Sequence, residues 1–210
     1  MNYTELTQAI KDYMENDETT FVNSIPTFVK NAERFIYNSV RLPALRKNVT
    51  ASTTTSNKYL SSPTDFLAVF EIAVVNTDGT YEFLLPKDVS FIRQNYPDPA
   101  YVALPKYYAI FDEDTFILGP TPDNTYTVEL HYYYYPESIV TANTSYLGTN
   151  FDQVLLYGSL IEAYTFLKGE PVMMKEYKEK FGEYMQTLVT LANGKLKADV
   201  YRNSKYFTNF

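Results

Sequence analysis

The sequence predicts an α+β fold, with a helical body made from both chain ends, an inserted and mainly antiparallel β-domain, and an extended carboxyl-terminal tail. Two observations predict it. Apolar residues recur at helical spacing near the amino terminus and again after about residue 150. Between these segments, apolar and polar residues alternate as in strands. The expected boundaries are 1–48 and 145–195 for the helical body, 55–140 for the β-domain and 196–210 for the tail.

Two helices are expected at the amino terminus. The first has Thr4 as its N-cap, with Leu6 and Ile10 at helical spacing. The second is expected to open after Ser24-Ile25-Pro26, because proline fits the first turn of a helix, where its missing N–H is harmless. Its apolar stripe comprises Phe28, Ala32, Phe35 and Ile36, flanked by Val29 and Val40. The polar stretch 49–57 reads as an exposed loop.

Strand patterns fill the middle of the chain. Phe70, Ile72 and Val74 alternate with Val69, Glu71 and Ala73, and a turn at 76–79 leads to a returning strand at 81–85. A short helix is expected over 88–95, with Asp88 as its cap. A second hairpin is expected from 106–111 and 115–118. The last strand, 125–135, places Val128, Leu130, Tyr132 and Tyr134 on one face.

Two further helices are expected near the carboxyl terminus. Segment 152–168 is apolar almost all round, which is typical of a buried helix. Its small residues Gly158, Ser159 and Ala163 would let a neighbouring backbone come close. Gly169-Glu170-Pro171 predicts a stop and a restart, and a more exposed helix follows over about 172–196. The stripe of this last helix includes Tyr177, Phe181, Leu188 and Leu191.

The composition excludes several classes of function. The chain has 210 residues with 18 basic and 25 acidic ones, a net charge of −7, which argues against a protein that coats nucleic acid. Cysteine is absent and His131 is the single histidine, so thiol catalysis, zinc–thiolate sites and multi-histidine metal sites are excluded within one chain. No signal peptide or membrane span is expected. The 21 tyrosines favour either surfaces between subunits or strand faces.

Three polar features are candidate sites. Asp112-Glu113-Asp114 is either a cation site or a solvated turn, and its spacing lacks the pattern of a calcium loop. His131 lies on a strand face with Glu129 and Tyr133, without a nucleophile motif, which favours a structural role. Glu162, inside the apolar helix, is either a catalytic acid or a hydrogen-bonded or interfacial carboxylate. No catalytic, cofactor-binding or metal-binding residue is therefore assigned, and no cofactor is expected.

The carboxyl-terminal segment differs from the rest of the chain in charge. Residues 175–210 hold seven basic and four acidic side chains, whereas the other 174 residues sum to −10. The last fifteen residues mix basic and aromatic groups, which are Lys197, Tyr201, Arg202, Lys205, Tyr206, Phe207 and Phe210. This pattern is compatible with a frayed terminus or with a peptide that orders against a partner.

Several segments together resemble the adaptor, or head-to-tail connector, proteins of short-tailed bacteriophages. The two most telling are the turn Gly119-Pro120-Thr121-Pro122-Asp123 and the helix Leu156-Tyr157-Gly158-Ser159-Leu160-x-Glu162-Ala163. The others, in chain order, are Leu6-x-x-x-Ile10, Ile25-Pro26-x-Phe28, Arg41-Leu42-Pro43, Tyr59-Leu60-x-x-Pro63, Leu104-Pro105-x-Tyr107-Tyr108, Leu130-His131-Tyr132-Tyr133 and Asp199-x-Tyr201-Arg202. They span essentially the whole chain.

The resemblance implies a structural, non-enzymatic virion protein of the tail or neck, assembled in the host cytoplasm. It implies a ring, typically dodecameric, that joins the portal protein to the tail nozzle or fibres. DNA passes through such a ring without specific binding, and no membrane is involved. In such adaptors the carboxyl-terminal segment reaches the portal, so the basic and aromatic residues between Lys197 and Phe210 are the expected docking residues. The alternatives are a carbohydrate- or receptor-binding tail module and, further away, a cell-wall glycosidase with two carboxylates.

Overall fold

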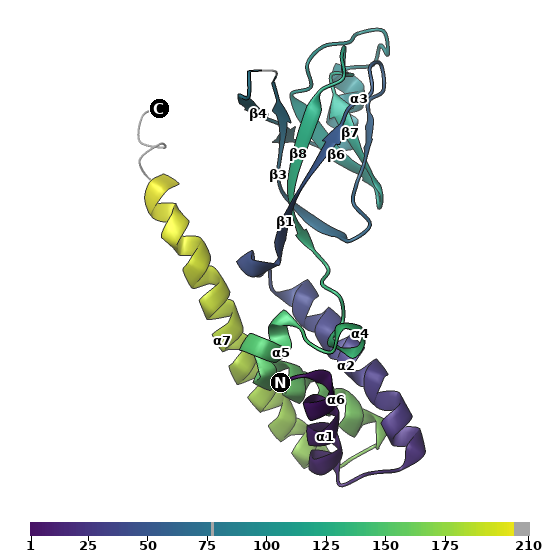
Figure 1. Cartoon of the computed structure of the whole chain (residues 1–210), viewed down its shortest axis with the longest axis vertical. Helices are drawn as coiled ribbons and strands as arrows, with labels where there is room; N and C mark the ends of the chain where they lie inside the picture. The colour runs from purple at the N-terminus through teal and green to yellow at the C-terminus, as the bar shows by residue number, and fades with distance from the viewer. Residues whose placement is uncertain (77, 204–210) are drawn as a thin grey trace. The chain divides into compact units, whose positions relative to one another are not determined.

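The protein, described as a computed structural model, is a mixed α+β chain that divides into two compact units (Figure 1). The structure describes residues 1–76 and 78–203, with side chains through Ala192. We name the two parts the helical unit, formed by Met1–Pro43 and the described chain from Pro136 onward, and the β-unit, Ala44–Tyr135. The predicted α+β class is confirmed, since helices gather at both chain ends and two mainly antiparallel sheets lie between them in sequence.

The first two helices begin at other residues than the sequence predicts. Helix α1 (Tyr3–Met14) is capped by Asn2 instead of Thr4, because Asn2 and Glu5 form a reciprocal capping box with two 2.9 Å hydrogen bonds. Helix α2 (Thr19–Ser39) begins at Thr19, whereas the sequence predicts a start after Ser24-Ile25-Pro26. Pro26 therefore lies inside the helix. Phe21 and Ile25 precede the proline and are fully buried. Their burial, about 1.5–3 kcal/mol each, offsets the roughly 3 kcal/mol that an interior proline costs.

Helix α6 (Asp152–Phe166) is the centre of the helical unit, in contact with α1, α2 and α7. At Gly158, one of the predicted small residues, the close approach is made by side chains of the neighbouring helices. A Cβ built on Gly158 would lie 3.1 Å from the Cβ of Ala32 on α2 and 3.1 Å from a ring carbon of Phe181 on α7. Helix α7 spans Pro171–Asn203, so residues 196–203 of the expected tail are helical, and 204–210 lie outside the described residues.

Two short helices that the sequence analysis did not predict precede α6. They are α4 (Ile139–Ala142) and α5 (Tyr146–Asn150). Helix α4 is held to α2 by Glu33, whose carboxylate accepts hydrogen bonds from the backbone N–H of Ile139 at 2.9 Å and from the hydroxyl of Ser138 at 2.5 Å. Glu33 is only 3% exposed, and it is the buried carboxylate of this unit that sequence reasoning missed.

The β-unit contains two four-stranded sheets. The first has the order β1 (Arg46–Ser52), β8 (Thr127–Tyr134), β3 (Phe66–Val75) and β4 (Tyr81–Phe83), with antiparallel pairs throughout. The second has the order β2 (Tyr59–Ser61), β7 (Thr115–Gly119), β6 (Tyr107–Asp112) and β5 (Leu85–Pro86), in which β5 and β6 are parallel. A 3-10 turn, η1 (Pro43–Leu45), precedes β1.

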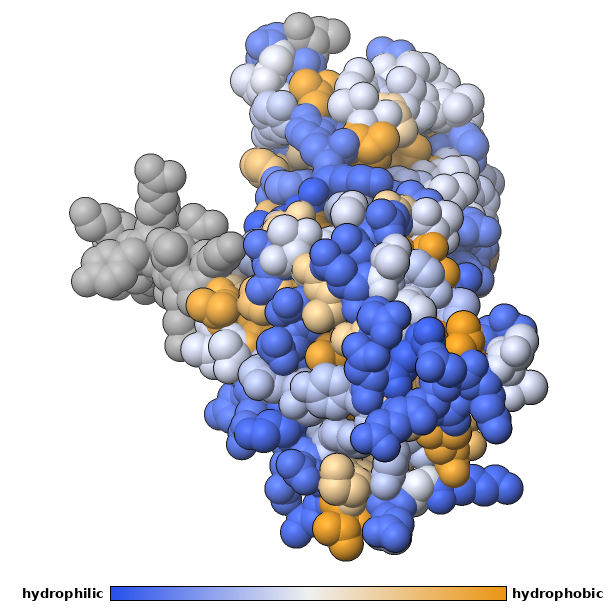
Figure 2. Space-filling model, turned by 60° about the horizontal axis from the view of Figure 1, so that its bottom comes forward, coloured by the Kyte–Doolittle hydropathy of each residue, from blue (hydrophilic) through white to orange (hydrophobic). Residues whose placement is uncertain are grey.

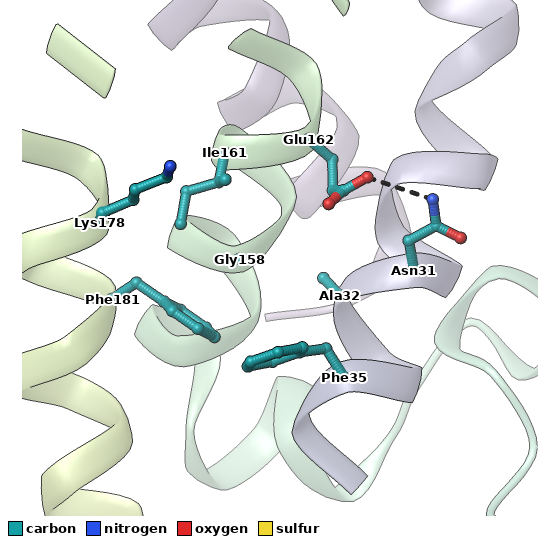
Figure 3. Close-up of a pocket in the computed structure, with 8 residues that line it drawn as sticks. All are labelled: Asn31, Ala32, Phe35, Gly158, Ile161, Glu162, Lys178 and Phe181. Atoms are coloured by element: carbon teal, nitrogen blue, oxygen red, sulfur yellow. Dashed lines mark hydrogen bonds between the residues drawn. The ribbon is translucent and has the colours of Figure 1, made fainter. Parts of the chain in front are cut away.

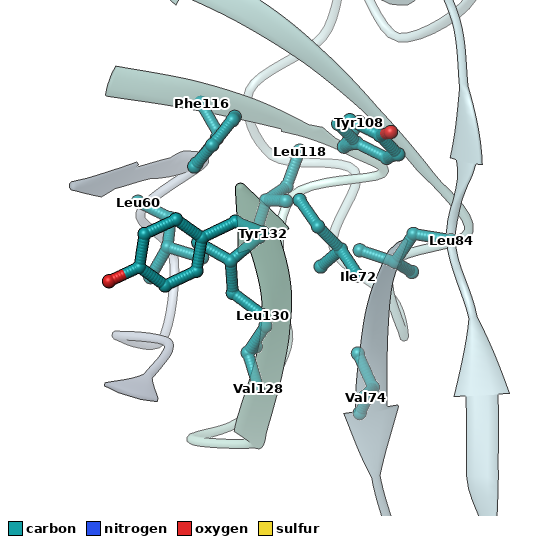
Figure 4. Packing of buried hydrophobic residues seen from close by; sticks show 10 residues of the cluster. All are labelled: Leu60, Ile72, Val74, Leu84, Tyr108, Phe116, Leu118, Val128, Leu130 and Tyr132. Carbon is teal, nitrogen blue, oxygen red and sulfur yellow. The ribbon is translucent and has the colours of Figure 1, made fainter. Parts of the chain in front are cut away.

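The core of the β-unit lies between the two sheets (Figure 4). Both predicted hairpins are present, and alternate side chains of β3 and β8 point into this core. Its buried members are Leu60, Ile72, Val74, Leu84, Tyr108, Phe116, Leu118, Val128, Leu130 and Tyr132. The predicted short helix, α3 (Val89–Asn95), packs through Ile92 against Ala109 and Ile117 of the second sheet.

Two expectations for the β-unit were wrong. The stretch 49–57 is not all loop, because β1 runs to Ser52 and pairs with β8 as an edge strand. Its side chains are largely exposed, so no apolar alternation marked it as a strand. Phe70 does not share the buried face of Ile72 and Val74, because a bulge between Val69 and Glu71 shifts the alternation, and Phe70 is 44% exposed.

Asp65 joins three strands of the first sheet at one end. Its carboxylate accepts hydrogen bonds from Lys47 of β1 at 2.5 Å and from the Tyr132 hydroxyl of β8 at 2.8 Å. Burial alone would raise the pKa of Asp65, but the Lys47 and Tyr132 hydrogen bonds and the lysine charge lower it below its ordinary value. Burial and the bond to Asp65 together raise the pKa of Tyr132 to about 12.

Candidate functional site

Three helices of the helical unit frame an open groove of about 270 Å³ (Figure 3). Gly158 of α6 is one of its lining residues, at a point where side chains of α2 and α7 approach the helix so closely that a Cβ would lie 3.1 Å from each. The walls of the groove come from α2, α6 and α7, and the lining residues are Asn31, Ala32, Phe35, Gly158, Ile161, Glu162, Lys178 and Phe181. We call this site the helical groove.

An aromatic pair forms the apolar wall of the helical groove. Phe35 of α2 and Phe181 of α7 lie with ring centroids 5.8 Å apart and their planes tilted by 52°. Both residues belong to the apolar stripes that the sequence predicts for their helices. Phe35 lies at the edge of the α2 stripe and is 59% exposed. An exposed aromatic ring in a concave apolar site is the kind of anchor that partner proteins bury.

Polar groups border the helical groove on two sides. The amide of Asn31 donates to the carboxylate of Glu162 at 3.2 Å, and Lys178 extends from α7 on the other side (Figure 3). Glu162 is therefore hydrogen-bonded and half-buried, as one of its two sequence interpretations predicted. Among the described residues that line the groove it is the single carboxylate, so a two-carboxylate glycosidase site is not assembled there.

The other polar candidates lie in the β-unit. His131 is half-buried on β8, with Nδ1 3.7 Å from a carboxylate oxygen of Glu71 and its ring edge-on to Phe70. Asp112 accepts a 3.1 Å hydrogen bond from the backbone N–H of Asp114, which fits an exposed turn. Among the described side chains, which are those of residues 1–76 and 78–192, no group of three or more acidic or histidine residues is placed to hold a metal ion.

Tyrosines pack inside the helical unit, which neither sequence interpretation foresaw. The ring of Tyr157 on α6 lies 6.3 Å from Tyr13 of α1, 6.2 Å from Tyr177 and 5.5 Å from Tyr184 of α7, between ring centroids. Burial, with a hydrogen bond to Tyr13, raises the pKa of Tyr157 to about 12. Part of the tyrosine excess therefore stabilises contacts between helices of one chain.

The expected docking residues fall at the end of the described chain. Lys197, Tyr201 and Arg202 lie on α7, in the part for which side chains are not described. Lys205, Tyr206, Phe207 and Phe210 lie outside the described residues. The structure thus neither brings this set together nor separates it, and the helical groove, which the sequence analysis did not predict, is a second candidate contact surface.

The fold and the groove define the class of protein. It is a two-unit α+β protein with an open apolar groove, a type of surface that often binds a partner. The sequence model of the SU10 adaptor protein family matches residues 1–204, and the chain belongs to that family of phage adaptor proteins. The resemblance seen in the sequence is confirmed. No curated protein matches the sequence. Among the described helices, none is long and apolar enough to span a membrane.

Proposed function

We propose that this adaptor is a non-enzymatic structural protein of the virion neck, which forms a dodecameric ring between the portal protein and the tail nozzle or fibres. The observation that carries the proposal is the family match over residues 1–204, which covers both the helical unit and the β-unit. DNA passes through the ring without sequence-specific contacts. Assembly takes place in the host cytoplasm, before the tail proteins join.

The apolar surface of the helical unit supports lateral contacts in such a ring. A closed ring uses two different surfaces on each copy, and one of them contacts the other surface on the neighbouring copy. The helical groove, with Phe35 and Phe181, is a concave surface of that kind. On the face drawn in Figure 2, apolar residues form separate groups within a mostly hydrophilic surface. Apolar groups this small are compatible with a protein that stays monomeric in solution and forms a ring only when a partner protein holds several copies side by side.

The charge of the chain supports passage of DNA. The β-unit holds six basic and eleven acidic residues, a net charge of −5 out of the total of −7. Each phosphate that a protein neutralises adds affinity for DNA, so an acidic lining leaves the duplex free to move. The same charge, repeated around a ring, opposes assembly of the free protein, so we expect the ring to form where contacts with a portal template offset the repulsion.

Native mass spectrometry of the purified protein, alone and mixed with its portal protein, tests this function. We expect monomers or weak oligomers of the protein alone at micromolar concentration, and twelve copies bound to one portal ring. Phe35→Asp is expected to reduce the number of bound copies, because it places a charge at the helical groove. Val172→Asp, at a strongly exposed apolar position of α7, is the matched control.

Two results would contradict the proposal. Stable dodecamers of the protein alone would show that no template is needed. Absence of any complex with the portal would refute the connector function itself.

A further inference from the structure

The outer face of the first sheet of the β-unit contains a second hollow, of about 240 Å³. Side chains alternate along β3 and β8, and Ile72, Val74 and Leu130 point into the core (Figure 4). Their neighbours in sequence therefore face the opposite side, and with two residues of β4 they line the hollow. We call it the outer-face pocket, and its lining residues are Glu71, Ala73, Tyr81, Phe83, Glu129 and His131.

A small residue creates this hollow. Ala73 pairs with Glu129 on one neighbouring strand and with Phe83 on the other, so three positions in a row cross the sheet at this level. Because Ala73 has only a methyl group, the space between the carboxylate and the aromatic ring stays open. The floor is therefore a β-carbon, with a charged wall on the β8 side and an aromatic wall on the β4 side.

The aromatic wall is exposed and ordered. Tyr81 and Phe83 are 50% and 59% exposed, and their rings are stacked, with centroids 6.3 Å apart and an angle of 19° between planes. The Tyr81 hydroxyl of β4 donates to Glu129 of β8, two strands away in the sheet, at 3.0 Å. This bond fixes both the ring and the carboxylate before any ligand binds, which lowers the entropy lost on binding.

Two carboxylates line the pocket, Glu129 on β8 and Glu71 on β3. Glu129 accepts hydrogen bonds from Tyr81 and from the amide of Asn48, and a carboxylate has further lone pairs to accept more. A carboxylate oxygen of Glu71 lies 3.7 Å from Nδ1 of His131. In the described part of the chain, neither carboxylate forms an ion pair with a lysine or an arginine. The pocket therefore presents two carboxylates without a lysine or arginine partner, next to flat aromatic surface.

We propose that the outer-face pocket binds an arginine side chain of a partner protein. A guanidinium is planar, so it stacks on aromatic rings while its N–H groups donate in pairs to a carboxylate. A lysine ammonium would pair with the carboxylates but, not being planar, would not stack on the aromatic rings. A metal ion would use the carboxylates but not the rings, and no three-ligand group is placed there among the described side chains.

The same sheet shows this type of contact within the chain. The guanidinium carbon of Arg46 lies 3.8 Å from the centroid of the Phe70 ring, and one of its nitrogens donates to the Tyr133 hydroxyl at 3.0 Å. The net charge of −5 on the β-unit also favours approach of a basic partner. The inference goes beyond the connector function, because it specifies a side chain that the β-unit recognises whatever the geometry of the assembly.

NMR titration of the full chain with N-acetyl-arginine methylamide tests the proposal. The matched neutral probe is the citrulline analogue, which keeps the shape and loses the charge. We expect saturable shifts at Ala73, Phe83 and Glu129 with the arginine probe and little response to the citrulline probe. Glu129→Gln is expected to weaken binding about fivefold, as for an exposed ion pair. Phe83→Ala is expected to weaken it as well, because the aromatic wall is lost.

Glu82→Gln is the matched control. Glu82 lies on β4 between the two aromatic residues and faces the other side of the strand. Its substitution by glutamine removes the same charge as Glu129→Gln. Circular dichroism of each variant verifies folding, and Tyr81→Phe offers a second variant that keeps the ring but releases Glu129. Equal binding of both probes, an unchanged affinity in Glu129→Gln, or binding of a neutral sugar in place of arginine would overturn the proposal. Because the isolated chain is used, these outcomes are independent of ring formation.

Discussion

Replacing Glu33 by alanine is expected to destabilise the helical unit by about 3 kcal/mol. The carboxylate accepts one hydrogen bond from Ile139 and one from Ser138, and bonds to a charged group contribute about 1.5–3 kcal/mol each. Removal leaves the buried N–H of Ile139 without its acceptor, while relief of the buried charge offsets part of the loss. For a unit of this size the melting temperature should fall by about 10 °C.

The pH dependence of stability separates the charge of Glu33 from its hydrogen bonds. Burial raises the pKa of Glu33, although the bonds from Ile139 and Ser138 and the charge of Lys30 act in the opposite direction. The folded state therefore holds this proton more tightly than the unfolded chain, whose carboxyl titrates near 4.5. The contribution of Glu33 to stability is greatest below that pH and is lost as the pH rises through the folded pKa.

Glu33→Gln tests this sign, because an amide keeps the size and one acceptor but does not titrate. We expect the stability of the glutamine variant, relative to the natural protein, to rise as the pH increases from about 4.5 through the folded pKa of Glu33. Urea unfolding followed by circular dichroism measures it, and Glu137→Gln, an exposed carboxylate nearby, is the control. A difference that stays constant over this range, or a loss below about 1 kcal/mol in Glu33→Ala, would refute the reasoning.

Three further predictions concern other parts of the chain. Asp65→Asn should lower the free energy of unfolding by about 1 kcal/mol at neutral pH. Because the pKa of Asp65 is lowered in the folded state, this difference should disappear as the pH falls below about 3.8. Acid unfolding curves of the two proteins measure it. Gly158→Leu should cost more than about 2 kcal/mol in thermal melts, whereas Gly182→Leu, where a Cβ meets no atom within 4 Å, should not be destabilising. Deletion of residues 196–210 should leave the melting temperature nearly unchanged but abolish co-sedimentation with the portal; normal docking would contradict the role of this segment.

Periodicity predicted the parts of the fold in which burial repeats along one element. Helix α6 is an example, because nearly every side of it meets another helix and its apolar residues reveal this directly. Helix α2 shows the limit. Pro26 is a strong local signal for a helix start, yet Phe21 and Ile25 are buried by tertiary contacts that local sequence does not display. The N-cap at Asn2 could be predicted from its spacing to Glu5, because a residue that can cap a helix and a glutamate three positions later form a capping box.

The candidate sites were harder to predict than the fold. The helical groove combines Gly158 of α6 with rings from two other helices, so its members are distant in sequence. The outer-face pocket depends on register: Ala73 stands between Glu129 and Phe83 only because three strands pair in one alignment. A bulge near Val69 already broke the simple alternation on that strand, which shows why a face cannot be assigned from spacing alone.

Strand β1, which the sequence did not reveal, explains how a β-unit can interrupt a helical unit. Within the β-unit, β1 pairs with β8 from Arg46 opposite Tyr133 to Ser52 opposite Thr127. The first strand and the last are thus antiparallel neighbours, and the chain enters and leaves the β-unit at the same end of this pair. A unit whose two ends lie side by side can be inserted between helices without separating them. Because this requirement concerns backbone pairing, the side chains of β1 are free to be polar and exposed, which is why they resemble a loop.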